Sequence, residues 1–590
     1  MKKPMRHKLL VGRVLPIVAA LGLYACDRTL TDAAAPQGTL DPSTLSTPQG
    51  VEGSLIATYR ALDWNNAVGG DWGWAASNWV WGSVTSDDAY KGSEASDQPG
   101  VTDIELYQWS TNGTDGYLND AWRGAYEGVA RANATLRLLK EVQEKSPGAI
   151  ATIDAQGIAG EAIFLRAHYH FSAWRMWANI PYYREDDTDF RKANLDSAAV
   201  VTELLKDLDS AVVLLPEAPR GGAVGRVTRW TAQAYKGRVH AYANQWPQAL
   251  TTLGAVRSGG PYALETSFDR VWTGFTEFRN GKETILAYQA ANDGEPNGNN
   301  ANYGERLNFP HSGSPFGCCG FHQPSQNLVN FFTVDATTGL PLALTDPNWN
   351  ANSANFIAGA TTPVDPRLDW TVGRDGVPYK DWGAHEPGWI RSATYGGSYS
   401  PKKNVHEKAS GAQSNVGWAP AQLNSVPIHI FRYADLLLLL AEAEVEAGSA
   451  ENARTIVNEI RTRAGAKAQG PGTDKGSIGV PIDDPSVTWA DYQIGLYTNP
   501  WASQAEARAA VRTERRLELA MEGQRFFDLR RWGTFQQVLN DYLAVESTRR
   551  LFLAAASPVT ERYSLFPIPS VQIELSKVGT ESQLEQNPGW

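Results

Sequence analysis

The sequence predicts a mainly α-helical protein built from helix pairs, which carries long irregular loops and few short strands. In several separate segments, apolar residues recur at alternating spacings of three and four, the period of one buried helix stripe. Two of these segments are followed by a tight turn and a second helical segment. Between about residues 290 and 425 this pattern stops, and Gly, Pro and Asn become frequent, which indicates inserted loops.

The first 25 residues have the features of a signal peptide. Five Lys or Arg residues and no acid precede ten apolar or small residues, 14–23, a run too short to span a bilayer, which takes about 20 residues. Leu23, Tyr24, Ala25 and Cys26 then resemble a bacterial lipobox, so Cys26 is the expected site of lipidation. The alternative is an ordinary secretory signal with an incidental cysteine.

Composition limits the partners of the mature chain. Without the five leader cations, the formal charge falls from −11 to −16, which argues against nucleic acid as a partner. No later segment has the length and apolarity of a membrane-spanning helix, so we expect an anchored protein. Residues 26–49 are rich in Thr, Ala, Pro, Asp and Gly and predict a flexible tether, and residues 50–590 predict the folded domain.

The predicted helices follow in chain order. Apolar stripes run through 122–139, 164–178, 235–242 and 436–447. The segment 230–244 is followed by a helix starting near Pro247, and 433–447 by a helix that Ser449 can cap and that runs to about residue 464. Such pairs resemble tetratricopeptide units. A last long helix is expected from Ser503, with Glu506 completing a capping box and with residues 517, 520 and 521 on one face.

Several motifs resemble the SusD/RagB family. They are Arg-Ala-His-Tyr-His-Phe at 166–171 with Asn-Ile-Pro-Tyr-Tyr at 179–183, Asp-Pro-Arg-Leu at 365–368, Arg-Tyr-Ala-Asp-Leu at 432–436, the block 514–533, and Phe-Pro-Ile-Pro at 566–569 with Gln-Asn-Pro-Gly-Trp at 586–590. The resemblance implies four tetratricopeptide-like helix pairs under an irregular binding face. It also implies a lipid-anchored protein of the outer membrane, facing the cell exterior. The partner would be a TonB-dependent transporter barrel (SusC-like). The usual cargo is oligosaccharide, and some members take peptides.

Charged residues of alternating sign fill the block 514–533. Glu518 and Glu522 could be read as a catalytic pair, but spacings of three and four let these charges pair along a helix. We favour a structural ion-pair network, because nothing isolates one acid and raises its pKa.

The segment 63–81 is the first candidate for ligand binding. It places Trp residues among Gly and Asn, and indole faces pack on sugar C–H groups while Asn and Asp bind hydroxyls. Trp72 and Trp74, like Trp79 and Trp81, are two residues apart and would share a face in an extended segment. We expect at least two of these Trp to be exposed, the alternative being aromatic core. The proposed ligand contacts here and just beyond are Asp71, Trp72, Trp74, Asn78, Trp79, Trp81, Asp87 and Tyr90.

Two further candidates lie in the loop-rich region. Trp382 and Trp389 stand among Gly and Pro within 370–418, with the same chemistry and the same alternative of core packing. Cys318 and Cys319 are adjacent, and in an oxidising compartment they can close a vicinal disulfide that forms an apolar platform. Free thiols are one alternative. A zinc site with His311 and His322 is the other, although consecutive ligands fit tetrahedral zinc poorly.

No sequence motif of a hydrolase, a metalloprotease or a nucleotide-binding enzyme is present, so we expect a binding protein that needs no cofactor and no metal. A glycan binder needs only aromatic and hydrogen-bonding groups on a rigid scaffold. A peptide-binding member of the same importer family and a helix-pair scaffold that holds another protein are the alternatives.

Overall fold

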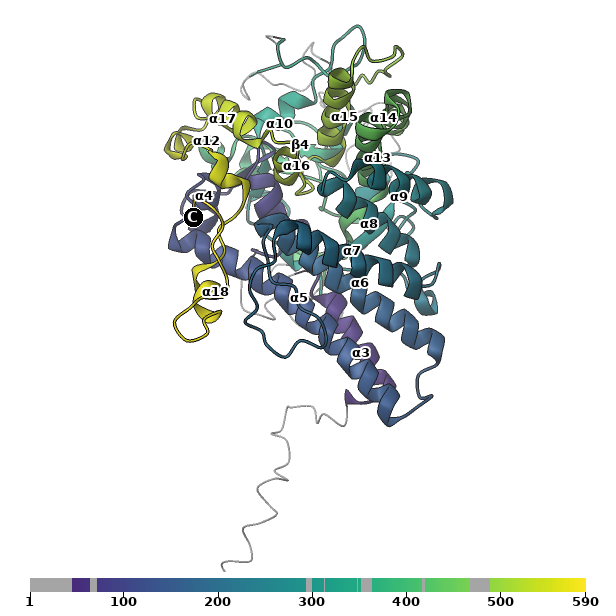
Figure 1. Ribbon diagram of the computed structural model, residues 1–590. Coiled ribbons are helices and arrows are strands. Elements are labelled where there is room, and N and C mark those ends of the chain that lie inside the picture. The colour runs from purple at the N-terminus through teal and green to yellow at the C-terminus, as the bar shows by residue number, and fades with distance from the viewer. Residues whose placement is uncertain are drawn as a thin grey trace, which may run out of the picture.

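The computed structural model describes residues 45–63, 72–292, 300–311, 313–346, 349–351, 363–415, 420–466 and 489–590. Its long helices lie side by side in an array (Figure 1). They are α3 Pro48–Arg60, α5 Asn112–Lys145, α6 Thr152–Trp177, α7 Ser197–Leu214, α8 Arg229–Tyr242, α9 Trp246–Gly259, α13 Tyr433–Ala447, α14 Ala450–Ala464 and α15 Gln504–Leu519. From α5 to α9 each helix contacts the next, and α9 then contacts α13, so the array continues across the loop-rich region. The mainly helical fold is confirmed.

Both predicted helix pairs are present. Thr228 caps α8, and Pro247 occupies the first turn of α9, where its missing N–H costs no hydrogen bond. Ser449 caps α14 by accepting a hydrogen bond from the backbone N–H of Glu451. In each pair the two helices pack against one another.

Helix α15 differs from its prediction at both ends. Ser503 accepts from the backbone N–H of Glu506 at 3.2 Å, but the Glu506 carboxylate accepts from Ala502 rather than from Ser503, so only half of the capping box forms. The helix ends at Leu519, and Met521 has a left-handed φ of 64°. Leu517, Ala520 and Met521 nevertheless pack in one apolar cluster, because the turn after the helix folds back.

Strands are few and short. They form three antiparallel pairs, β1 Ala89–Gly92 with β3 Phe321–Pro324, β2 Thr284–Tyr288 with β6 Ile428–Arg432, and β4 Val372–Gly373 with β5 Ser400–Pro401. The shorter α-helices are α4 Pro99–Glu105, α10 Gln326–Phe331, α11 Arg367–Thr371, α12 Ala393–Gly396, α16 Arg525–Arg531, α17 Phe535–Glu546 and α18 Ser570–Leu575. Single turns of 3-10 helix lie at Arg220–Gly222, Asp269–Trp272, Tyr303–Glu305, Pro387–Trp389, Lys408–Ser410, Pro420–Gln422, Leu551–Ala555 and Glu561–Ser564, and a π-helix at Val80–Val84. Within 290–425 no described α-helix is longer than the six residues of α10.

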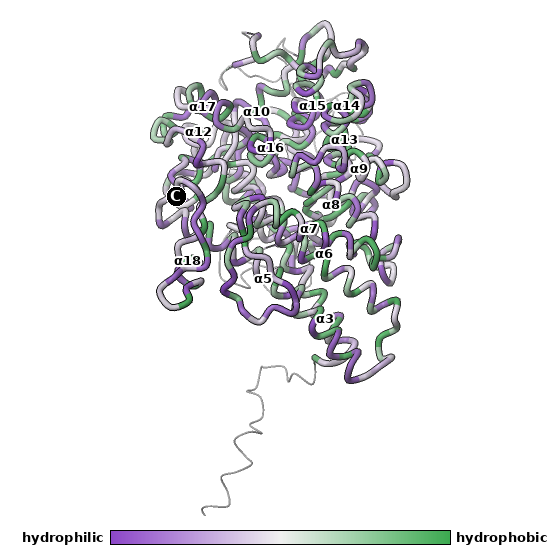
Figure 2. Tube along the Cα trace, in the orientation of Figure 1, coloured by the Kyte–Doolittle hydropathy of each residue, from purple (hydrophilic) through white to green (hydrophobic). Residues whose placement is uncertain are grey.

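The core is centred on α13. Residues 436–440 are five consecutive leucines, and all five are buried. This helix contacts α8, α9, α14 and α15, so apolar neighbours surround it and it needs no wide polar face. Figure 2 shows the surrounding helices mixing hydrophilic and hydrophobic residues along their length, as helices with one solvent face do.

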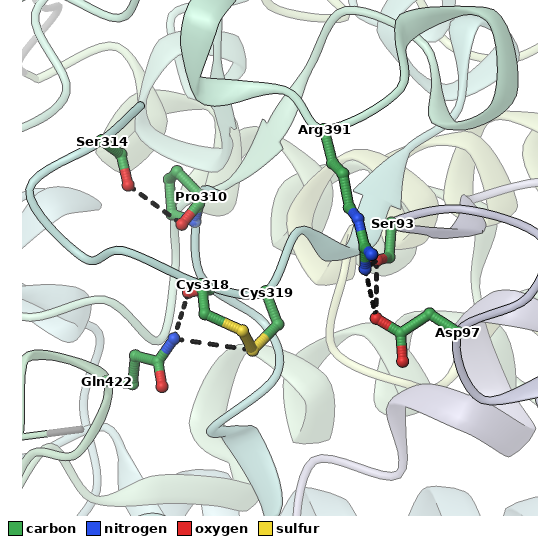
Figure 3. Close-up of a disulfide and its surroundings, with 8 residues drawn as sticks. All are labelled: Ser93, Asp97, Pro310, Ser314, Cys318, Cys319, Arg391 and Gln422. Carbon is green, nitrogen blue, oxygen red and sulfur yellow. Dashed lines mark hydrogen bonds and ion pairs between the residues drawn. A yellow bond between two sulfur atoms is a disulfide. The ribbon is translucent and has the colours of Figure 1, made fainter. Parts of the chain in front are cut away.

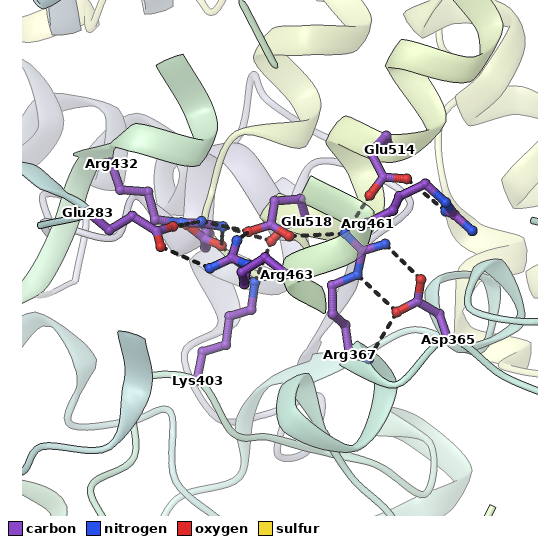
Figure 4. A network of polar contacts seen from close by, with 10 residues as sticks. Glu283, Asp365, Arg367, Lys403, Arg432, Arg461, Arg463, Glu514 and Glu518 are labelled. Carbon is purple, nitrogen blue, oxygen red and sulfur yellow. Dashed lines mark hydrogen bonds and ion pairs between the residues drawn. The ribbon is translucent and has the colours of Figure 1, made fainter. Parts of the chain in front are cut away.

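The charged block 514–533 forms a buried ion-pair network (Figure 4). Glu518 accepts hydrogen bonds from Arg432 at 2.8 Å and from Arg367 at 3.0 Å, and it also pairs with Arg463. Although burial opposes it, these guanidinium groups hold the pKa of Glu518 well below its usual range. A carboxylate kept ionised in this way is no proton donor. The network joins α15 to β6, α14 and the start of α11, and the structural interpretation is confirmed.

The expected tether is too long by a few residues. Thr47 caps α3, which begins at Pro48, and Ser46 donates a hydrogen bond to Glu141 at 2.7 Å. The folded body therefore includes these residues, because a capped helix start fixes their backbone. The expected leader, Cys26 and residues 26–44 lie outside the described residues. Within the described ranges, no helix has the length and apolarity to cross a bilayer.

Candidate functional site

Three of the expected contact residues in the first aromatic segment, Trp72, Trp79 and Trp81, belong to the core. Trp79 and Trp81 are 0% and 2% exposed. The Trp79 ring packs edge-on against Phe321, and the Trp81 ring against Phe566. Both indole N–H groups donate to backbone carbonyl groups. Because Trp79 leads into a π-helix rather than an extended strand, the expected shared face does not form. The prediction of exposure is wrong for this pair.

Of the other members, Trp72 is core as well, whereas Trp74 and Asn78 lie nearer the surface and donate hydrogen bonds to backbone carbonyl oxygens of the protein. Trp72 is buried and stacks on Tyr303 with ring centroids 5.6 Å apart. Trp74 is half-buried and donates to the carbonyl oxygen of Ala61 at 2.9 Å. Asn78 is half-buried and donates to the carbonyl oxygen of Gly523. Asp71 lies outside the described residues.

Asp87 and Tyr90 are structural. Asp87 is buried, pairs with Arg516 and receives two hydrogen bonds from Arg525. Although burial opposes it, these two cations lower the pKa of Asp87 to about 2. Tyr90 is buried and donates to Glu546 at 2.5 Å. The expectation that they contact ligand is wrong, because their polar groups are already paired inside the protein.

The two tryptophans of the loop-rich region differ in exposure. Trp389 is buried and packs edge-on against Tyr379, so it is core and not a ligand contact. Trp382 is half-buried, and its ring lies 4.7 Å from that of Phe316. The Trp382 indole N–H donates inward to the carbonyl oxygen of His406 at 2.8 Å, which directs the ring's polar edge into the protein.

Cys318 and Cys319 form a disulfide two residues after Phe316 (Figure 3). Cys318 is half-buried, and Cys319 is 5% exposed. Gln422 holds this turn from one side, because its side-chain amide donates to the carbonyl oxygen of Cys318 and lies 3.6 Å from the Sγ of Cys319. The alternative zinc site with His311 and His322 would need thiolates, which the disulfide consumes. No cluster of three or more metal-binding side chains occurs in the described ranges.

A network of buried amides lies behind Gln422. Asn302 accepts from the backbone N–H of Asn424 at 2.6 Å, and the Asn424 side chain donates to the carbonyl oxygen of Asn404. Asn404 and Asn308 in turn donate to the carboxylate of Glu305. Burial raises the pKa of Glu305. The network fixes three loops from distant parts of the sequence relative to one another.

A charged rim lies on the other side of the disulfide. Arg391 donates to Asp97 at 2.6 Å and to the Ser93 hydroxyl at 2.9 Å (Figure 3). It also donates to Glu94 at 2.6 Å. The side chains of Arg391, Glu94 and Asp97 are partly exposed, whereas Ser93 is buried. Lys91 holds the turn beneath them by donating to the backbone carbonyl groups of residues 94 and 97. Burial lowers the pKa of Lys91 to about 8.

A family model described as SusD family matches residues 282–590, more than half of the chain. The chain belongs to the SusD family. A second model, described as starch-binding associating with outer membrane, matches residues 75–240. The SusD-like protein P38 of Formosa agariphila is 23% identical over 546 residues, covering 89% of this chain and 91% of that protein.

Solved SusD-like structures share the fold. One is described as a laminarin-binding SusD-like protein, with a TM-score of 0.64 and 21% identity over 92% of this chain and 100% of that chain. Another is surface glycan-binding protein A from Bacteroides thetaiotaomicron in complex with laminarihexaose, with a TM-score of 0.61 and 18% identity over 92% of this chain and 99% of that chain.

Three residues of this candidate site were not found from the sequence. Gln422, Arg391 and Asp97 contact the disulfide turn or its neighbours only through folding, since 104 residues separate Gln422 from Cys318 and 294 separate Arg391 from Asp97. No local spacing marks such residues. The signal in the sequence for this turn was the adjacent cysteine pair itself with its flanking glycines, and it does not point to these three partners.

Proposed function

We propose that this protein binds oligosaccharides at its loop-rich face and delivers them to a TonB-dependent transporter barrel of the outer membrane. It does so as a binding protein and not as an enzyme. A lipid on Cys26 anchors it, and the binding face is turned to the cell exterior. The observation that carries the proposal is the SusD family match over residues 282–590. The relatives described as binding laminarin or laminarihexaose support carbohydrate as the ligand class.

The geometry of the loop-rich face supports this function. Trp382 presents a partly exposed ring, and the Arg391 cluster presents partly exposed groups that donate and accept hydrogen bonds. Sugars combine apolar C–H faces with hydroxyl groups, so they need both kinds of contact. The buried amide network and disulfide hold these side chains on a rigid base, which lowers the entropy lost on binding.

The binding proposal is tested by titration. Purified protein in detergent is titrated with neutral and charged oligosaccharides and with mixed oligopeptides, followed by calorimetry and tryptophan fluorescence. We expect saturable binding of at least one oligosaccharide. Binding of peptides alone would replace the proposal with the peptide-binding alternative.

The anchoring and delivery proposals need a different readout. Mass spectrometry of the mature chain from cells is expected to show a lipidated N-terminal Cys26, and Cys26→Ala should release the protein from the membrane fraction. A tagged copy is expected to co-purify with a TonB-dependent barrel. A mature chain that lacks lipid would contradict the anchor, and capture of a helical partner without a barrel would favour the scaffold alternative.

A further inference from the structure

We propose that the Cys318–Cys319 disulfide forms the floor of a subsite for a neutral sugar ring, with Gln422 on one side and the Arg391–Asp97 pair on the other. The inference rests on the proposed function, because it names one contact surface of the same binding face. It adds the chemistry of that floor and the charge class of the ligand.

The disulfide offers an apolar surface at the edge of the protein. Cys318 is half-buried, while Cys319 packs into the main core cluster. A side chain built on the preceding residue, Gly317, would meet nothing within 4 Å, so open space lies beside the disulfide. Sulfur in a disulfide is a weak hydrogen-bond acceptor, so it behaves as a small apolar group. Such a surface matches the C–H face of a sugar ring.

Gln422 carries an unused acceptor beside this floor. Its side chain is fully buried, and its amide nitrogen contacts both cysteines. Its side-chain oxygen has no hydrogen-bond partner among the described residues. A buried carbonyl oxygen without a partner is unfavourable, so a turn of the Gln422 amide that brought this oxygen to a ligand hydroxyl would gain a hydrogen bond that the oxygen now lacks. Gln422 is therefore the polar group that we expect to adjust when a sugar binds on the floor.

The opposite rim determines which sugars fit. Gly320 follows the disulfide directly, and a Cβ built on it would lie 3.8 Å from Ser93 and 3.9 Å from the Cβ of Arg391. The rim therefore adjoins the floor. Arg391 and the underlying Lys91 face two carboxylates, Glu94 and Asp97, so the charges of the rim balance and the guanidinium is already paired. A uronate or sulfated sugar would therefore meet only cations that already have partners, whereas neutral hydroxyl groups can donate to the carboxylates and accept from Arg391.

The test compares the wild-type protein with the double variant Cys318→Ser/Cys319→Ser. Both are titrated in detergent with neutral hexasaccharides of β-1,3-glucan, β-1,4-glucan, α-1,4-glucan, xylan and mannan, and with alginate and sulfated galactan oligomers. We expect the variant to bind the preferred neutral glycan about ten-fold more weakly, the effect of losing one well-buried apolar contact. Val213→Ser, at a position 84% exposed on α7, is the control with unchanged affinity.

The double variant is expected to fold, since a disulfide between neighbours closes the smallest loop and restricts the unfolded chain least. Its melting temperature checks this. If it fails to fold, Arg391→Ala takes its place, because Arg391 is partly exposed, and it should likewise weaken neutral-glycan binding about ten-fold. Alkylation of the native wild-type protein should find no free thiol at residues 318 and 319.

The outcomes separate the two proposals. Absence of oligosaccharide binding by the wild type overturns the proposed function. Wild-type binding that the double variant retains in full, or two free thiols in native protein, overturns the disulfide floor and leaves the proposed function standing. Tighter wild-type binding of alginate or sulfated galactan than of every neutral glycan overturns the charge assignment.

Discussion

His170 is held in its neutral form by both of its ring nitrogens. Its Nδ1 lies 3.1 Å from the carbonyl oxygen of Arg166 and must donate, so its Nε2 accepts from the backbone N–H of Tyr183 at 3.2 Å. Burial, aided by Arg166, lowers the pKa of His170 to about 3. The imidazole of His170 therefore takes up a proton near pH 6.5 in the unfolded chain, but stays neutral at that pH in the folded chain.

The depressed pKa of His170 predicts that acid lowers the free energy of unfolding. Because the pKa of His170 is depressed in the folded state, its contribution to stability is present above pH 6.5 and is lost as pH falls toward 3. His170→Gln should reduce the pH dependence of the unfolding free energy between pH 6 and pH 4 by about 1.4 kcal/mol per pH unit. Urea denaturation of both proteins across this range measures the slope. Equal slopes would contradict the assignment.

Trp382 is a residue whose proposed contact with oligosaccharide can be tested by substitution. Its ring faces Phe316 on the loop-rich surface, and we expect Trp382→Ala to weaken oligosaccharide binding about 10- to 30-fold through loss of ring contact with the sugar. Trp230→Ala, at a similarly half-buried tryptophan on α8, is the matched control. Equal calorimetric affinity of the two variants would exclude Trp382 from the binding face.

At the scale of elements, α15 depends on charges from its neighbours. Glu518→Gln removes the carboxylate shared by Arg367, Arg432 and Arg463 and leaves buried cations short of a partner. We expect it to lower the free energy of unfolding by about 3–5 kcal/mol. Glu451→Gln, which loses a pair whose carboxylate side chain is 57% exposed, should cost less than about 1 kcal/mol. Denaturant titrations of the two variants make the comparison, and equal losses would contradict the structural role.

Helices were predictable where their signals are local. The stripe in α5, the proline that opens α9 and the serine that caps α14 depend on residues within one or two turns of each other. The end of α15 was not predicted, because the turn that stops it at Leu519 packs against distant residues of the loop-rich region.

At the scale of the whole molecule, exposure was the property that sequence patterns did not predict. Trp79 and Trp81 stand among Gly and Asn, which is typical of a surface loop, yet Phe321 and Phe566 cover them. The same packing brings Gly82 so close to Gly523 that a Cβ on Gly82 would overlap the Gly523 backbone. Only the folded chain reveals such a contact. The adjacent cysteines, in contrast, were recognisable because their separation is one residue.

Helix α5 sets the distance between the candidate site and the point where the chain enters the folded body. Ser46 donates a hydrogen bond to Glu141 near the C-terminal end of α5, whereas Tyr117 near its N-terminal end donates to Gln98, which directly follows the rim residue Asp97 in sequence. At 1.5 Å per residue, the helix rises roughly 36 Å between these two contacts. The rim that we propose as a sugar contact thus lies at the end of α5 opposite to the point where the chain enters the folded body, and a single rigid helix fixes the distance between them.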